Sequence, residues 1–186
     1  RPMTDMILLD PVRVLVGPDQ PLQDQGAALL RGGRLEALGE HAREAARSAG
    51  LSASDAGHQL LAPCLVDAHS SLPEPFQGQG ETLESLVRSA ATGGYGQLAL
   101  LPDASGSRRE LPERLQGCQL AGCDVAVHLW AGFSQGGHGE QLTPHADLIE
   151  AGAVGLSDGA RMPPVPLLDR ALTLGESGSS PVLIPP

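Results

Sequence analysis

The sequence predicts an α/β protein: a small β-rich domain over residues 1–59, then the first half of an eight-stranded (β/α) barrel over residues 60–186. The first sixty residues contain strand-like runs, turn glycines and one short helical pattern. From Leu60 onward, short apolar runs alternate with helical stretches, which is typical of parallel βα units whose strands are buried on both faces.

Composition narrows the class of protein. Of the 186 residues, 41% are hydrophobic and 18% are charged, which is ordinary for a soluble globular protein. The formal net charge of −10 argues against a nucleic-acid partner or an anionic membrane surface. Three cysteines without CxxC spacing, and no apolar run near the roughly 20 residues that span a bilayer, favour a cytoplasmic protein. We therefore expect a small molecule or another protein as the partner.

All twelve basic residues are arginines, and the sequence contains no lysine. The chain therefore offers no lysine Schiff base, no P-loop lysine and no carboxylated-lysine bridge between metals.

The first domain is predicted from its strand and turn signals. Met6–Val16 is strand-like but is expected to break at Asp10-Pro11. Gly32-Gly33 lies between two apolar runs and suits the tight turn of a hairpin. His41–Ser48 has helical spacing and is expected to stop at Gly50.

The second domain is predicted from five apolar runs that read as strands. Two helices are expected between them. Glu81–Thr92 has a single apolar face, and Thr143–Ala151 opens with Thr143 as N-cap and Pro144 at the first helical position. The apolar face comprises Leu83, Leu86, Val87, Ala90 and Ala91, and the five runs are residues 60–69, 97–103, 123–132, 151–159 and 181–186.

Five such strands cannot close a barrel, for which about 250 residues are typical. Either the sequence is a fragment or the rest of the barrel is absent from it; if the chain ends at Pro186, an open parallel edge and exposed apolar faces would call for a homo-oligomer or another partner.

The order of these features, with LLAPCLVDAHSSLPEP at residues 60–75 and AGAVGLSDG at residues 151–159, resembles the N-terminal half of the dihydroorotase or cyclic amidohydrolase family of the amidohydrolase superfamily. The resemblance covers nearly the whole chain and is strongest over residues 60–103. It implies a partial TIM-type barrel of that superfamily, preceded by a small β-sandwich-like domain.

The first barrel strand of that family ends in a PGxxDxHxHxREPG pattern. Two histidines one residue apart point the same way from a strand, so both can reach one metal ion. Here Asp67 and His69 match, but Ser71 stands at the second histidine and Pro73 at the arginine that the resemblance assigns to substrate binding, while Glu74-Pro75 remains.

The later landmarks of the family also differ. Leu101-Pro102-Asp103 replaces the MPN pattern, so an acid stands in place of a substrate-binding amide. Ser157, followed by Asp158, stands where the resemblance implies the carboxylated lysine. Pro185 and Pro186 stand where a metal-binding histidine is implied.

Two hypotheses follow from these departures. The first is a dihydroorotase-like protein of the pyrimidine-biosynthesis type that is catalytically degenerate, binds no metal and acts as a scaffold or binding subunit. Its remnant positions are Asp67, His69, Asp103 and Asp158, with His69 alone left as a candidate metal ligand. The resemblance implies aspartate carbamoyltransferase as a possible type of partner. The alternative is an active zinc-dependent cyclic amidohydrolase with a rebuilt site.

Other residues that could carry chemistry have plainer interpretations. His128 alternates within a strand and reads as a hydrogen-bonded core or interface residue, and Cys64 reads as buried packing. His138 and His145 match no compact metal motif. The glycine-rich run at residues 132–140 lacks a P-loop lysine and reads as a loop.

Overall fold

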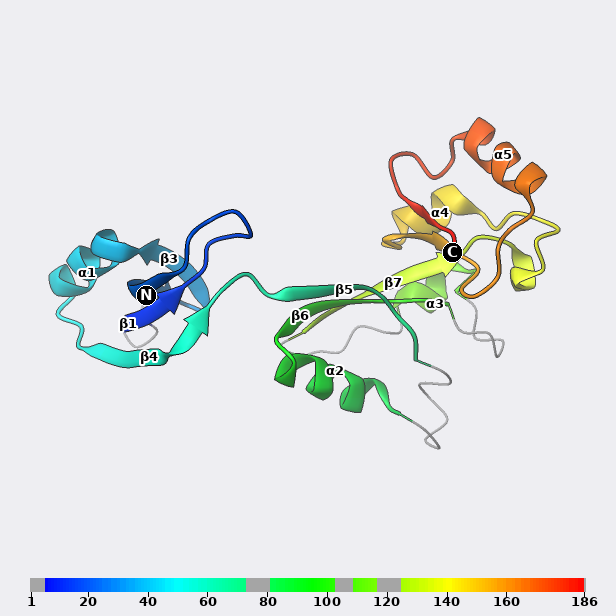
Figure 1. Cartoon of the computed structure of the whole chain (residues 1–186). Coiled ribbons are helices and arrows are strands. Elements are labelled where there is room, and N and C mark those ends of the chain that lie inside the picture. Colours follow the sequence, from blue (N-terminus) through cyan, green and yellow to red (C-terminus); the bar gives the residue numbers. More distant parts are fainter. Residues whose placement is uncertain (1–5, 73–80, 103–108, 117–124, 186) are drawn as a thin grey trace. The chain divides into compact units, whose positions relative to one another are not determined.

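The computed structural model describes residues 6–72, 81–102, 109–116 and 125–185. The chain divides into two compact units, Arg1–Pro63 and Cys64–Pro186, each with its own core (Figure 1). Within the described ranges, no helix is long and apolar enough to cross a membrane.

The first unit is built on one four-stranded sheet. Its strands are β1 (Met6–Val14), β2 (Gln23–Arg31), β3 (Arg34–Leu38) and β4 (Ala53–Leu61), in the order β3-β2-β1-β4. The β1–β2 and β2–β3 pairs are antiparallel, whereas β1 and β4 are parallel. The described residues thus form a single mixed sheet, and the expected β-sandwich is not confirmed.

Helix α1 (Gly39–Ser48) supplies the second layer of this unit. Its buried Ala42 and Ala46 pack with Leu8 and Leu29 of the sheet. Because a helix covers this face with small side chains, a second sheet is not needed to bury it. The predicted helix is therefore confirmed, two residues longer at its start.

The turns of the first unit follow the sequence signals. Gly32 and Gly33 have φ angles of 57° and 72°, which a type I′ hairpin turn requires, and Gly50 follows α1 with φ of 67°. The expected break at Asp10-Pro11 is wrong. Strand β1 continues through it, with a shift in pairing register between Leu9 and Val12.

The second unit has a parallel five-stranded sheet in sequence order. Its strands are β5 (Leu65–Ser70), β6 (Tyr95–Leu100), β7 (Ala126–Gly132), β8 (Gly155–Ser157) and β9 (Val182–Leu183). Each strand pairs with the next one along the chain, as consecutive strands of a (β/α) barrel do (Figure 1). The predicted mixed α/β half-barrel is confirmed.

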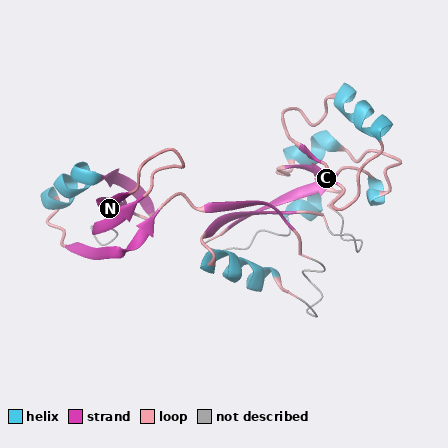
Figure 2. Cartoon of the chain, in the orientation of Figure 1, coloured by secondary structure: helices cyan, strands magenta, loops and turns pink. Residues whose placement is uncertain are grey.

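Helices connect these strands (Figure 2). They are α2 (Leu83–Thr92), α3 (Pro112–Gln116), α4 (His145–Glu150) and α5 (Val165–Leu174), with a 3-10 turn η2 at Gln135–Gly137. Helices α3 and α5 were not predicted from the sequence. The core between helices and sheet includes Val87, Leu98, Leu100, Leu129, Phe133, Leu148, Leu156, Leu167 and Ala171.

Helix α2 begins at a capping box. The Thr82 hydroxyl accepts the Ser85 N–H, and the Ser85 hydroxyl accepts the Thr82 N–H, both at 3.1 Å. Its predicted apolar face is buried at Leu83, Val87 and Ala90, whereas Ala91 is exposed.

Two predictions about the start of the barrel are wrong. The run at residues 60–69 is two strands, because β4 ends at Leu61 and β5 begins at Leu65. Strand β5 is an edge strand rather than a buried one: Leu65 is 53% exposed and Val66 is 57% exposed. Cys64, expected to be buried, is exposed as well.

The predicted N-cap role of Thr143 is also wrong. Pro144 occupies the N-cap position of α4, and the buried Thr143 hydroxyl instead donates to the Gly132 carbonyl at 2.6 Å. Thr143 therefore holds the loop to the end of β7.

Candidate functional site

The candidate residues lie where the strands of the second unit end. Parallel strands bring their carboxyl ends to one edge of the sheet, which is the catalytic end of (β/α) barrels. Strand β5 carries Asp67 and His69 toward this edge, and Ser157 and Asp158 lie at the end of β8. Candidates that lie outside the described residues are Pro73, Glu74, Pro75, Asp103 and Pro186.

Asp67 is engaged within its own strand. One carboxylate oxygen accepts the His69 backbone N–H at 3.1 Å, and the other accepts the Ser70 hydroxyl. Ser70 is buried, whereas the His69 residue is exposed. The carboxylate therefore stabilises the end of β5.

Asp158 is only 5% exposed and joins the ends of β8 and β7. Its Oδ1 accepts the backbone N–H groups of Phe133 at 3.1 Å and Ser134 at 2.9 Å, and its Oδ2 accepts the Ser134 hydroxyl. Ser134 Oγ in turn accepts the Gly139 N–H at 2.9 Å. Both carboxylate oxygens are thus committed to the loop that follows β7.

Ser157, at the position compared with the carboxylated lysine, links β8 to β9. Its buried hydroxyl donates to the Leu183 carbonyl at 3.3 Å and accepts the Gly159 N–H at 3.1 Å. Pro185 follows β9 and is partly buried. A neutral serine hydroxyl is a poor zinc ligand, and proline has no side-chain donor atom.

Sequence reasoning missed the roles of three buried residues at this edge, one of which, Thr143, was expected only as a helix N-cap. Trp130 Nε1 donates to the Ala68 carbonyl at 2.8 Å, and Arg109 donates to the carbonyls of Leu100 and Trp130. Thr143 is the third. An arginine in a loop and a tryptophan in an apolar strand carry no local signal of these partners, which lie between 9 and 62 positions away in the sequence.

The other histidines have distinct environments. His128 Nε2 lies 3.1 Å from Gln97 Oε1, which fits the predicted hydrogen-bonded residue in a strand. His145 is 1% exposed, and its Nε2 donates to the Phe133 carbonyl at 2.8 Å while its ring contacts the Phe133 ring. His138 is exposed.

The donor groups that the structure describes at this edge do not by themselves form a zinc site. Structural and catalytic zinc sites use three or four Cys, His, Asp or Glu side chains. In the described part of the chain, no three such side chains gather in a way that could hold a metal ion. The carboxylates of Asp67 and Asp158 already accept protein hydrogen bonds.

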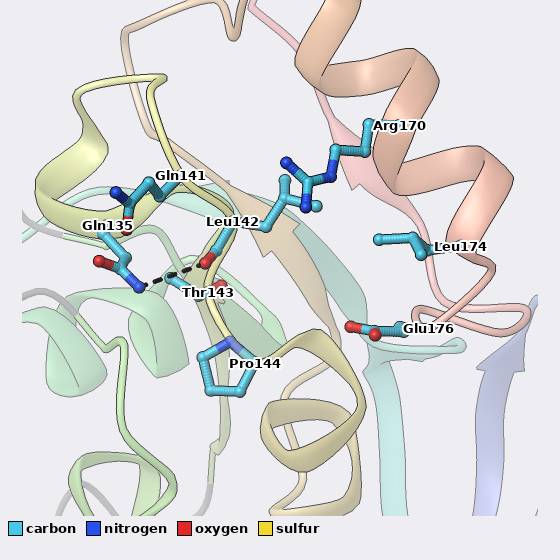
Figure 3. A pocket seen from close by; sticks show the side chains of 8 residues that line it. All are labelled: Gln135, Gln141, Leu142, Thr143, Pro144, Arg170, Leu174 and Glu176. Atoms are coloured by element: carbon cyan, nitrogen blue, oxygen red, sulfur yellow. Dashed lines mark hydrogen bonds between the residues drawn. The ribbon is translucent and has the colours of Figure 1, made fainter.

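A cavity of about 550 Å³ lies beside the loop that follows β7. Figure 3 shows the loop after β7 on one side of it and the end of α5 on the other, with Gln135 Nε2 donating to the Leu142 carbonyl at 3.4 Å. None of the predicted site residues lines it. The lining residues are Gln135, Gln141, Leu142, Thr143, Pro144, Arg170, Leu174 and Glu176.

Comparisons with known proteins identify relatives. The chain is 34% identical over 152 residues to a "Probable dihydroorotase-like protein" of Synechocystis, covering 68% of this chain and 34% of that protein. It is 33% identical over 156 residues to a dihydroorotase of Syntrophus aciditrophicus (82% and 35% covered). It is 37% identical over 106 residues to a dihydroorotase of Bacillus caldolyticus (56% and 25% covered).

The chain was also compared with solved structures and with models of protein families. A solved Xaa-Pro dipeptidase with bound methionine is similar with a TM-score of 0.43 and 12% identity, over 82% of this chain and 46% of that one. No model of a known protein family matches the chain. The chain spans between a quarter and about a third of the length of the three dihydroorotase relatives. From the relatives at 33–37% identity, the chain belongs to the dihydroorotase family.

Proposed function

We propose that this chain is a catalytically degenerate dihydroorotase-like protein that binds no metal and serves as a scaffold or binding subunit of the pyrimidine-biosynthesis type. The observation that supports the proposal best is the hydrogen bonding of the Asp158 side chain. This buried carboxylate accepts three hydrogen bonds from Phe133 and Ser134, so both of its oxygens hold the loop that follows β7.

The chemistry of a metal hydrolase supports the same proposal. Metal-assisted hydrolysis needs three or four protein ligands and an open position for water. Ser71 replaces the second histidine of the family pattern, and Ser157 is hydrogen-bonded to its neighbours. His69 then lacks the adjacent ligand with which the family pattern pairs it.

A binding role draws support from the edge of the sheet. Leu65 and Val66 expose more than half of their surface on β5, which has one neighbouring strand in this sheet. Large apolar side chains exposed next to each other are candidates for contact with another protein. We propose an aspartate carbamoyltransferase-like partner or a second copy of the chain as its occupant.

Metal content and hydrolysis together test the loss of catalysis. Protein is purified without chelators, as the longest product of its reading frame, and zinc per chain is measured beside hydrolysis of dihydroorotate. We expect less than about 0.1 zinc per chain and no hydrolysis above background. Near-stoichiometric zinc with activity that His69→Ala abolishes would refute the proposal. His138→Ala, which changes another exposed histidine, is the matched control.

Sedimentation tests the binding role. The protein is analysed alone and with aspartate carbamoyltransferase, and Leu65→Glu is expected to weaken any complex at least tenfold. Leu172→Glu changes a leucine that is 68% exposed on α5 and serves as the control. A monomer that binds no carbamoyltransferase, or equal effects of the two variants, would contradict the proposed edge.

A further inference from the structure

Trp130 connects two strands that are not neighbours in the sheet. Its indole Nε1 donates to the Ala68 carbonyl at 2.8 Å, so β7 is tied to β5 with β6 between them. The two residues are 62 positions apart, and Trp130 is only 6% exposed. The accepting carbonyl lies between Asp67 and His69.

The other side of the indole lies against β8. Trp130 is paired with Gly155, where an added Cβ would lie 2.3 Å from Trp130 Cζ3 and 2.5 Å from the Pro181 carbonyl oxygen. Real Cβ atoms do not approach so closely, so the ring occupies the space that a side chain on residue 155 would need. The indole therefore reaches from β5 to β8.

Strand alternation gives the face of the sheet on which the indole lies. Leu129 and Ala131 belong to the core shared with the helices, together with Val87 and Leu148. Successive side chains on a strand point to opposite faces, so Trp130 points away from that core. In a (β/α) barrel that opposite face is the interior, next to the edge where ligands bind.

We propose that Trp130 fills the barrel interior at this edge and holds the Asp67–His69 segment in place through the Ala68 carbonyl. The space between Ala68 and Gly155 accommodates a planar ring with an N–H donor, and in this protein the Trp130 indole occupies it. This inference rests on the proposed function, since a protein without catalysis can fill the interior with its own side chain. If the Trp130 side chain is removed, we expect the space to bind a planar heterocycle that carries an N–H group.

Indole rescue tests the proposal. Trp130 is the single tryptophan of the chain, so Trp130→Gly removes all tryptophan fluorescence and bound indole can be observed directly. We expect Trp130→Gly to lower the unfolding midpoint and added indole to raise it again by mass action. Benzofuran has nearly the same shape but no N–H, and we expect it to bind about tenfold more weakly, as for a lost hydrogen bond of ordinary strength.

Trp130→Phe provides a second measurement that does not depend on a cavity. It keeps an aromatic ring but removes the donor to Ala68, so hydrogen exchange of the β5 amides should accelerate about tenfold. Exchange in the first unit should not change. If Trp130→Gly does not fold even with indole, this exchange measurement alone tests whether Trp130 holds β5.

Three results would overturn the proposal: no binding of indole to folded Trp130→Gly, equal binding of indole and benzofuran, or unchanged β5 exchange in Trp130→Phe. Zinc in the wild-type protein is a separate result. It would contradict the proposed function, whereas the indole and exchange measurements report on Trp130 alone.

Discussion

Asp158 and Ser134 are joined by two hydrogen bonds. Asp158 Oδ1 accepts the Ser134 backbone N–H at 2.9 Å, and Oδ2 accepts the Ser134 hydroxyl. Together with the Phe133 N–H, three donors depend on this carboxylate. We expect Asp158→Ala to lower the free energy of unfolding of the second unit by about 2–4 kcal/mol, because buried donors lose their acceptor.

Trp130 fluorescence during urea unfolding measures this effect, since Trp130 lies in the second unit. Asp158→Asn should cost less, because its side-chain oxygen can still accept the two backbone N–H groups. Asp169→Ala alters an exposed carboxylate on α5 and should change little. Equal losses for Asp158→Ala and Asp169→Ala would show that the loop does not depend on this contact.

Gly155→Ala should destabilise the second unit through a steric clash. The added methyl group would overlap the Trp130 ring and the Pro181 carbonyl, and overpacking of this kind costs about 1–3 kcal/mol. Gly17→Ala is the matched control, because a Cβ at Gly17 meets no atom within 4 Å. Thermal unfolding of the two variants compares them, and a wild-type midpoint for Gly155→Ala would contradict the packing.

The ion pair between Asp10 and Arg43 should stabilise the first unit at neutral pH, and this stabilisation should be lost in acid. Arg43 donates to both Asp10 oxygens, at 2.9 and 3.0 Å, and this hydrogen bonding holds the pKa of Asp10 below its usual value. A lowered folded-state pKa adds stability above the unfolded pKa, and that stability is lost as the pH falls through the folded value. The contribution should be fully present at pH 6 and should begin to be lost only as the pH falls below about 4, the ordinary pKa of an aspartate.

The Asp10→Asn variant measures this contribution. Because the pair is partly exposed, we expect a loss of about 1 kcal/mol at pH 6 that shrinks toward zero near pH 2. Asp24→Asn removes a more exposed partner of Arg13 and is the control. A difference between Asp10→Asn and wild type that stays constant with pH would contradict the assignment.

Thr82→Ala should weaken α2 at its start. It removes the hydroxyl that accepts the Ser85 N–H, and loss of such an N-cap costs about 1 kcal/mol. Thr82→Ser keeps the hydroxyl and should retain most of the stability. Urea unfolding compares the three proteins, and an equal loss in the serine variant would point to the methyl group instead of the cap.

The sequence predicts those parts of the fold that leave local signals. Buried parallel strands are short apolar runs, and paired glycines mark a hairpin, so β6 to β9 and the turn at Gly32-Gly33 could be located. Helix α5 was missed because its start, Val165-Pro166 after Pro164, reads as a loop, although proline is well tolerated in a first helical turn.

The site was harder to predict, because its contacts join residues far apart in the sequence. Nothing near Trp130 indicates that its partner is Ala68, and nothing near Asp158 indicates Phe133. The exposure of Leu65 could not be predicted either, since an apolar run does not show which of its faces another element covers.

The sequential order of β5 to β9 has a consequence for how the second unit folds. Every strand pairs with its predecessor, at separations from 25 positions (Trp130 to Gly155) to 31 positions (Asp67 to Leu98), so no pairing in the sheet waits for a strand that is made later. Each new strand could dock on an edge that has already formed while the ribosome is still adding residues. Such a sheet can grow in the direction of its own synthesis.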